Sequence, residues 1–153
     1  RVLTTHAPFI WGPDVSPDGK DVAFSRGEVD GSWHIWSIPF EGGTPRRLTF
    51  TEGGEVYPRY TADGSALLFH TWQAPRRIGR VPRAGGVPTM LPAGGASDAF
   101  PDLSADGRWL AVTRTDSDAE RIFIASGTVA TRFSPARVSR GTPISRDMSD
   151  PQK

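Results

Sequence analysis

The feature that most constrains this chain is a motif that occurs three times at nearly constant spacing. Each copy begins with proline, carries an Asp-Gly pair five residues later and continues into an apolar run. The copies are PDVSPDGKDVAF from Pro13, PRYTADGSALLF from Pro58 and PDLSADGRWLAV from Pro101, at intervals of 45 and 43 residues. A second marker, GGTP at Gly42 and GGVP at Gly85, repeats after 43 residues, and a leucine stands ten residues before each repeat proline. Markers that stay in register indicate a structural repeat.

Each repeat contains four short apolar runs separated by turn residues. In the first repeat these runs are DVSP, VAFS, HIWSIPF and RRLTF, which are rich in β-branched and aromatic residues. Asp-Gly tolerates the positive φ angles of a tight hairpin, so we expect these pairs to join the first two strands for a structural reason. One signal competes in the third repeat, where SDAE from Ser117 to Glu120 matches a helix capping box. The corresponding segments of the other repeats alternate like strands, which favours a strand there as well.

Four antiparallel strands in a repeat of 43 to 45 residues are typical of a β-propeller blade. The pattern P-x-x-S-P-D-G-K, followed by I-W-x-I and G-G-x-P-R-R-L-T, resembles the WD-like repeat of the TolB propeller family over roughly residues 1–126. The resemblance implies an all-β fold, here a β-propeller segment of three four-stranded blades, which is half of a six-bladed propeller. The second and third repeats read TADG and SADG, so they lack the proline before the turn but keep the Asp-Gly pair.

The repeats also set the expected domain boundaries. Residues 1–12 form the last strand of a preceding blade with its connecting loop, 13–57 form blade 1, 58–100 blade 2, 101–140 blade 3, and 141–153 the start of a truncated next blade or a tail. Three blades cannot close a ring. We therefore expect either a segment cut from a longer chain or a homodimer in which two copies close a six-bladed ring.

Composition argues against several classes of function. The 153 residues include 18 basic and 17 acidic residues, so no strong net charge attracts nucleic acid. No apolar run approaches the roughly 18 residues needed to cross a bilayer, and no membrane insertion is expected. The chain has no cysteine, which excludes disulfides and thiolate chemistry. The TolB resemblance implies the periplasm, and the residues themselves leave the cytoplasm open.

The sequence shows no recognisable catalytic motif. Nucleophile-elbow, phosphate-loop and zinc-protease patterns are absent, so a triad would have to use His6, His34 or His70. His34 lies in an expected strand and is predicted to pack there, whereas the other two lie in expected loops. The run DSDAE resembles the start of a calcium loop, but Arg121 occupies the position that requires glycine. No catalytic residue, metal ligand or cofactor is predicted in this chain.

The TolB resemblance also implies which loops share one face of the propeller. The loops before the first strand and after the second strand of each blade would lie together, and in this sequence they hold many carboxylates and large aromatic residues. Aromatic anchors ringed by one sign of charge are typical of protein-binding surfaces. The candidate binding residues are Trp11, Glu28, Asp30, Glu52, Glu55, Tyr57, His70, Trp72, Asp98, Phe100, Asp116 and Asp118.

The expected function is non-catalytic binding of a protein or peptide partner through this acidic and aromatic face. Two alternatives stay open. One is an accessory propeller, acting as a gate or sensor, of a prolyl-oligopeptidase-like hydrolase or a bacterial kinase or regulator whose catalytic domain lies outside this chain. The other is a propeller-type polysaccharide lyase, which would use loop histidines; a total of three histidines argues against it.

Overall fold

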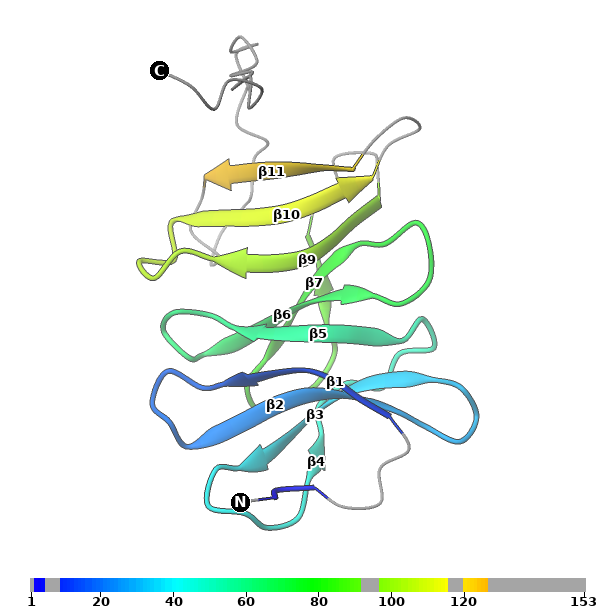
Figure 1. Ribbon diagram of the computed structural model, residues 1–153, viewed down its shortest axis with the longest axis vertical. Helices are drawn as coiled ribbons and strands as arrows, with labels where there is room; N and C mark the ends of the chain where they lie inside the picture. The colour runs from blue at the N-terminus through cyan, green and yellow to red at the C-terminus, as the bar shows by residue number, and fades with distance from the viewer. Residues whose placement is uncertain (1, 5–8, 92–96, 116–119, 127–153) are drawn as a thin grey trace, which may run out of the picture.

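The computed structural model describes residues 2–4, 9–91, 97–115 and 120–126. These residues form three antiparallel sheets that stack one on the next as blades (Figure 1). Blade 1 contains β1 (Phe9–Val15), β2 (Asp21–Gly27), β3 (Trp33–Pro39) and β4 (Arg46–Arg47). Blade 2 contains β5 (Glu55–Tyr60), β6 (Ala66–Thr71), β7 (Ile78–Pro82) and β8 (Thr89–Met90). The described part of blade 3 contains β9 (Ser97–Leu103), β10 (Trp109–Thr115) and β11 (Glu120–Ser126).

The predicted all-β class and the blade architecture are confirmed. Within each sheet the strands follow the order of the chain. Residues Glu120–Ser126 form a strand, β11, so the strand prediction for this segment is confirmed and the competing helix signal was misleading. β1 begins at Phe9, whereas the sequence repeats predicted that blade 1 begins at Pro13. The fourth strand expected for blade 3 falls outside the described residues. Within the described ranges, no helix has the length and apolarity needed to cross a membrane.

The three Asp-Gly pairs form the same hairpin turn between the first and second strands of each blade. Gly19, Gly64 and Gly107 have φ angles of 69°, 66° and 67°, a region that residues with a Cβ rarely adopt. Each aspartate accepts a hydrogen bond from the backbone N–H two residues later, at 3.0 to 3.1 Å. Each also accepts one from the hydroxyl two residues earlier, at 2.5 to 2.7 Å. The pairs therefore recur because the same turn is built three times.

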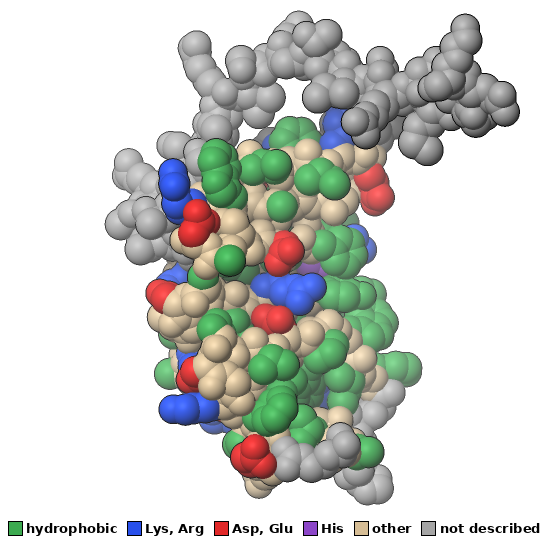
Figure 2. All heavy atoms as spheres, turned by 60° about the vertical axis from the view of Figure 1, so that its left-hand side comes forward, with side chains coloured by type: hydrophobic (Ala, Val, Ile, Leu, Met, Phe, Trp, Pro, Cys, Tyr) green, Lys and Arg blue, Asp and Glu red, His purple; other side chains and the backbone are tan. Residues whose placement is uncertain are grey.

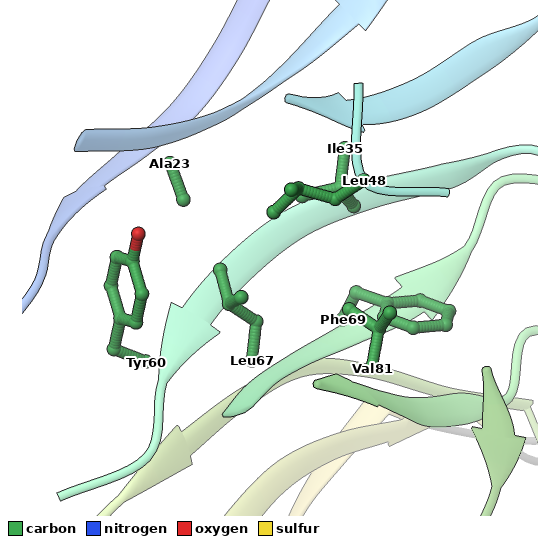
Figure 3. Close-up of a cluster of buried hydrophobic side chains, with 7 residues drawn as sticks. All are labelled: Ala23, Ile35, Leu48, Tyr60, Leu67, Phe69 and Val81. Carbon is green, nitrogen blue, oxygen red and sulfur yellow. The ribbon is translucent and has the colours of Figure 1, made fainter. Parts of the chain in front are cut away.

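The blades pack on one another through two apolar clusters. Between blades 2 and 3, Leu68 and Ile78 pack with Leu110 and Val112. Between blades 1 and 2, side chains from both sheets point toward one another (Figure 3). Alternate side chains of a strand point to opposite faces, so blade 2 is apolar on both faces and holds its two neighbours together. The buried residues between blades 1 and 2 are Ala23, Ile35, Leu48, Tyr60, Leu67, Phe69 and Val81.

A charged link joins blades 1 and 2 at the end that carries the Asp-Gly turns. Arg83, in the turn after β7, donates to Asp18 at 3.0 Å and to Asp21 at 2.6 Å across the blade boundary. These hydrogen bonds raise the pKa of Arg83 and lower the pKa of Asp18. At the opposite end of the strands lie the loops that lead into β5 and out of β2 and β6 (Figure 1). The candidate binding residues that the structure describes belong to that loop end.

Candidate binding site

Seven rings, counting the imidazole of His70, form a continuous aromatic cluster at the loop end of the three blades. Trp11 in β1 stacks on Trp33 at the start of β3, with ring centroids 4.1 Å apart, and Trp72 after β6 lies 5.4 Å from Trp11. Tyr57 in β5 lies 6.2 Å from Trp11 and 4.9 Å from Phe100 in β9, so it connects blade 1 to blade 3. The aromatic cluster consists of Phe9, Trp11, Trp33, Tyr57, His70, Trp72 and Phe100.

A β-bulge in the first strand of every blade shapes this cluster. The pairing register shifts at the residue before each repeat proline, which is Gly12, Tyr57 or Phe100. Their φ angles are 55°, 56° and 50°. Glycine adopts this left-handed region freely, whereas for a residue with a Cβ it costs roughly 1–2 kcal/mol. The two aromatic residues are therefore held in strained backbone conformations by the structure around them.

Tyr57 is held by the preceding blade from two directions. Its backbone N–H donates to Ser25 Oγ at 2.7 Å. Its ring lies over Gly12, where a Cβ would come within 2.7 Å of Tyr57 Cδ1. Glycine at position 12 thus leaves the space that the Tyr57 ring needs. Backbone strain of this kind persists only where the surrounding structure fixes it, and it is often found at ligand-binding sites.

The aromatic cluster presents exposed edges around a buried centre. Phe9, Trp72 and Phe100 are 60%, 39% and 46% exposed, whereas Trp33 and His70 are buried. Aromatic side chains that are already packed on one side lose little conformational freedom when a partner covers the other side. The cluster can therefore bind an apolar or aromatic group without first rearranging.

His70 places an unused hydrogen-bond acceptor among these rings. Its ring stacks on Tyr57 at 5.4 Å and meets the ring of Phe100 edge-on at 5.0 Å. Nδ1 lies 3.0 Å from the carbonyl oxygen of Thr71, which can only accept, so Nδ1 carries the hydrogen. Nε2 is buried and has no hydrogen-bond partner among the described residues. Burial lowers the pKa of His70, so the ring is neutral near pH 7.

Two of the predicted acidic binding residues are buried and have partners inside the fold. Glu55, at the start of β5, accepts a hydrogen bond from Thr49 Oγ1 at 2.6 Å and lies 3.2 Å from His34 Nδ1. Asp98, in β9, accepts from Arg114 through both carboxylate oxygens, at 2.5 and 2.8 Å. These carboxylates hold the loop end of the blades together.

Two other predicted carboxylates, Asp30 and Glu52, are exposed at the loop end, and a third, Glu28, lies 3.8 Å from Arg26. Glu52 is exposed between β4 and β5, Asp30 is exposed between β2 and β3, and Glu28 is partly exposed. Hydrogen bonds from the hydroxyl and backbone N–H of a neighbouring serine lower the pKa of Asp30. The predicted Asp116 and Asp118 lie outside the described residues. In the part of the chain that the structure describes, no three His, Asp or Glu side chains gather as a metal site would require.

A serine, a histidine and a glutamate line up beside the aromatic cluster. Ser32 Oγ lies 3.0 Å from His34 Nε2, and His34 Nδ1 lies 3.2 Å from Glu55 Oε2. This is the connectivity of a hydrolytic triad. However, His34 and Glu55 are buried, and the Ser32 hydroxyl donates to Asp30 at 2.6 Å. The arrangement therefore links Ser32, in the loop after β2, to Glu55 at the start of β5. His34 packs in the interior as predicted, and it does so through polar contacts.

The structure brings five of the predicted binding residues into the aromatic cluster and adds two that the sequence prediction did not include. The added residues are Phe9, which opens β1, and Trp33, which opens β3. Trp33 directly precedes the expected strand HIWSIPF, and Phe9 lies among residues 1–12, which were expected to hold the loop that leads into the first strand of blade 1. That position was the signal that could have found them. The five predicted members are Trp11, Tyr57, His70, Trp72 and Phe100.

Comparison with known sequences gives two partial matches, and no family model matches this sequence. An uncharacterized protein of Agrobacterium fabrum is 29% identical over 119 residues, which cover 77% of this chain and 40% of the relative. Tricorn protease homolog 1 of Streptomyces coelicolor is 37% identical over 103 residues, which cover 64% of this chain and 10% of the relative. This chain thus spans well under half the length of either relative.

Solved propeller structures share the fold. The putative TolB from Agrobacterium tumefaciens matches with a TM-score of 0.73 at 24% identity, over 80% of this chain and 47% of that chain. TolB from Acinetobacter baumannii matches with a TM-score of 0.71 at 26% identity, over 82% of this chain and 32% of that chain. The β-propeller domain of the Trilobed protease from Pyrococcus furiosus gives 0.55 at 17% identity, over 77% and 38%. The chain therefore has a TolB-like propeller fold, as the resemblance implied.

Proposed function

We propose that this propeller scaffold binds a protein or peptide partner through the aromatic cluster and has no catalytic centre of its own. The observation that carries the proposal is the continuous set of rings from Trp11 to Phe100, which is held by β-bulges and exposed at its edges. Binding energy at protein interfaces concentrates in large aromatic side chains on rigid, well-packed supports. The TolB and protease-propeller neighbours support a scaffold role.

The groups around the rings suggest the chemistry of the partner. Glu52 and Asp30 are exposed carboxylates at the same end of the blades, so a basic residue of the partner would find opposite charge there. The same carboxylates repel phosphate groups, and the proposal includes neither a nucleic acid nor membrane insertion. The partner that fits is a peptide segment with an aromatic or aliphatic anchor and a nearby Lys or Arg.

Selection from a phage-displayed random peptide library tests the proposal. Peptides selected on the wild-type chain are titrated against the wild type, Trp72→Ala and Phe9→Ala, with tryptophan fluorescence or calorimetry as the readout. Each substitution is expected to weaken binding about tenfold or more, because truncation of a hot-spot aromatic residue costs roughly 2 kcal/mol. The matched control is Val87→Ala, which changes a side chain that is 89% exposed in the turn after β7, at the other end of the blades. Selected peptides that bind Trp72→Ala and Phe9→Ala as tightly as the wild type would exclude this site.

A charge variant tests the acidic part of the site separately. Added salt is expected to weaken peptide binding by the wild type, and Glu52→Gln should reduce that salt dependence. Lys20→Gln, in the Asp-Gly turn at the opposite end, is the control and should leave the salt dependence unchanged. Equal salt slopes for the wild type and Glu52→Gln would remove the carboxylate from the proposal.

An accessory propeller of a hydrolase is the second candidate. It is favoured by the 37% identity to a tricorn protease homolog and by the match to the propeller domain of the Trilobed protease. In that case the aromatic cluster would receive the peptide substrate of a catalytic domain. A hydrolase domain in the coding sequence next to this segment would favour this candidate over an independent binding protein.

A further inference from the structure

The polar ring atoms at the surface of the aromatic cluster are hydrogen-bond donors. Trp72 is 39% exposed and Trp11 is partly exposed, and neither indole N–H donates to a described residue. An indole N–H can donate and cannot accept. The partly exposed Tyr57 also has a hydroxyl that can donate, and it has no partner among the same residues. The unused acceptor of the cluster, His70 Nε2, is buried. The ligand that matches this surface supplies acceptors.

The two tryptophans Trp33 and Trp72 are seated against the backbone at Gly54. The backbone N–H of Trp72 donates to the carbonyl oxygen of Gly54 at 3.1 Å. Gly54 has a φ angle of 66°, and a Cβ on it would lie 3.2 Å from Trp72 Cβ and 3.6 Å from Trp33 Cβ. Glycine at this position therefore lets both tryptophans approach the segment that leads into β5. Rings held in this way favour a ligand that is also ordered before it binds, because less freedom is then lost on binding.

The rings form a surface that crosses the three blades. Trp11 and Trp33 stack with an angle of 21° between their planes, and Tyr57 continues the row to Phe100. Figure 2 shows hydrophobic side chains gathered along the right-hand side of the described blades, toward this loop end. A ligand that contacts the whole row is a chain segment of several residues.

The backbone conformation of the ligand decides whether the donors of the cluster are matched. The carbonyl groups of a helix are hydrogen-bonded within the helix, and an added β-strand brings N–H groups that need acceptors. A polyproline II segment has no internal hydrogen bonds, so its carbonyl groups are free, and its prolines have no N–H. Such segments dock on aromatic-lined surfaces and are largely ordered before binding. A proline-rich segment therefore matches the donors, the rings and the rigidity of the cluster together.

Exposed carboxylates adjoin the tryptophans in two loops. Glu52 lies two residues before Gly54 and is exposed. Asp30 lies three residues before Trp33, and its carboxylate accepts from the hydroxyl and the backbone N–H of Ser32 at 2.6 and 2.9 Å. A Lys or Arg beside the prolines of a ligand would meet opposite charge at either loop.

We propose, on the basis of the peptide-binding role proposed above, that the aromatic cluster recognises a proline-rich segment in the polyproline II conformation with a Lys or Arg beside the prolines. The rings pack on the prolines, and the indole N–H groups donate to the carbonyl groups of the segment. Glu52 or Asp30 pairs with the basic residue.

Titration of the intact 153-residue chain with synthetic peptides tests this pairing. The probe is a proline-rich peptide with an arginine at each end, and its control has alanine in place of every proline and keeps both arginines. Calorimetry is expected to show that the control binds about tenfold more weakly than the probe, because alanine adds N–H groups and removes the ordered backbone. A proline-rich peptide with a glutamate at each end should also bind more weakly than the probe, since it meets like charge.

Trp72→Phe isolates the indole donor, because the substitution keeps an aromatic ring and removes the N–H. Its affinity for the probe is expected to fall about threefold to tenfold, as the loss of one hydrogen bond predicts. Val87→Ala, at the other end of the blades, is the control and should bind the probe as the wild type does. Circular dichroism and cooperative unfolding show that each variant is folded, and the comparison of peptides on the wild type does not depend on any variant.

The outcomes separate this proposal from the peptide-binding role itself. Equal binding of the probe and the alanine control would overturn the preference for proline and leave peptide binding intact. The same holds if the probe fails to bind while peptides selected from the random library bind at Trp72. An unchanged affinity of Trp72→Phe for the probe would overturn the role of the indole N–H. A neutral oligosaccharide that binds at Trp72, where neither the probe nor any selected peptide does, would overturn both proposals.

Discussion

Replacing Gly79 with alanine tests how tightly blade 2 is packed. Gly79 in β7 pairs with Phe69 in β6, and a Cβ at position 79 would lie within 2.6 Å of Phe69 Cε2. Phe69 is fully buried in the cluster of Figure 3, so its ring cannot move without displacing the contact between blades 1 and 2. Overpacking costs roughly 1–3 kcal/mol, and glycine to alanine in a strand gains roughly 0.5–1 kcal/mol. A contact this short lies at the upper end, so we expect the free energy of unfolding to fall by about 2 kcal/mol.

The other two blades show how this crowding is avoided elsewhere. At the equivalent cross-strand position, Phe24 pairs with Trp36 in blade 1, and Val112 pairs with Phe123 in blade 3. In blade 3 the smaller residue stands on the second strand and the larger one on the third. Blade 2 has the opposite arrangement, with the ring on the second strand and glycine on the third. In blade 1 two large rings pair at this position, so the absence of room for a Cβ in blade 2 comes from the placement of the Phe69 ring over Gly79 and not from the pairing itself.

A double-mutant cycle turns this relation into a measurement. Phe69→Val removes the ring, so Gly79→Ala should add little further loss in that background. We expect the double variant to be more stable than the sum of the single variants by about 1–2 kcal/mol. Urea unfolding followed by tryptophan fluorescence gives the four free energies. Gly53→Ala is the control, since a Cβ there would meet nothing within 4 Å. Additive free energies would refute the assignment of the loss to the clash with Phe69.

Three further predictions concern the turns, the buried histidine and the inter-blade ion pair. Gly64→Val should lower the free energy of unfolding by roughly 1–2 kcal/mol, because valine at positive φ is strained; an unchanged urea midpoint would contradict the hairpin assignment. The free energy of unfolding should fall as the pH drops below about 6.5. The pKa of His70 is lowered in the native state, so the unfolded chain binds a proton that the native state excludes. In His70→Gln this dependence of stability on pH should be lost. The same pH slope in that variant would assign the effect to another group. Arg83→Met should lower the melting temperature by less than Gly79→Ala does, with a smaller effect in high salt, and a salt-independent effect would argue against the ion pairs.

The fold could be predicted because its repeat is encoded in local signals. An Asp-Gly pair specifies a hairpin wherever it occurs between two apolar runs, and three such pairs at one spacing fix the blade period. The bulges at Tyr57 and Phe100 could not be predicted in this way. A residue before proline is normally driven toward extended backbone, so the local rule points away from a positive φ angle. Packing of the Tyr57 ring over Gly12 in the preceding blade overrides that preference.

The acidic part of the predicted site shows a different limit. Sequence position predicted that Glu52 and Glu55 share one loop end, and they do, but Glu52 is exposed while Glu55 is fully buried. The difference depends on Thr49, six residues before Glu55, and on His34, which reaches Glu55 from β3. Loop placement predicts the end of the blade at which a residue lies. It does not predict whether the side chain faces solvent, because that depends on which partners the folded chain brings to it.

The aromatic part of the site is coupled to the stacking of the blades. Gly12, Tyr57 and Phe100 follow the same 45- and 43-residue intervals as the turns, and the ring of Tyr57 rests on the blade before its own. Trp11 and Trp33 belong to blade 1, whereas Tyr57 and Trp72 belong to blade 2, so separation of these blades would divide the cluster. A peptide that binds both halves must therefore stabilise the contact between the blades, by an amount that grows with its concentration. Conversely, a substitution that loosens this contact should weaken peptide binding even when it lies far from the loop end.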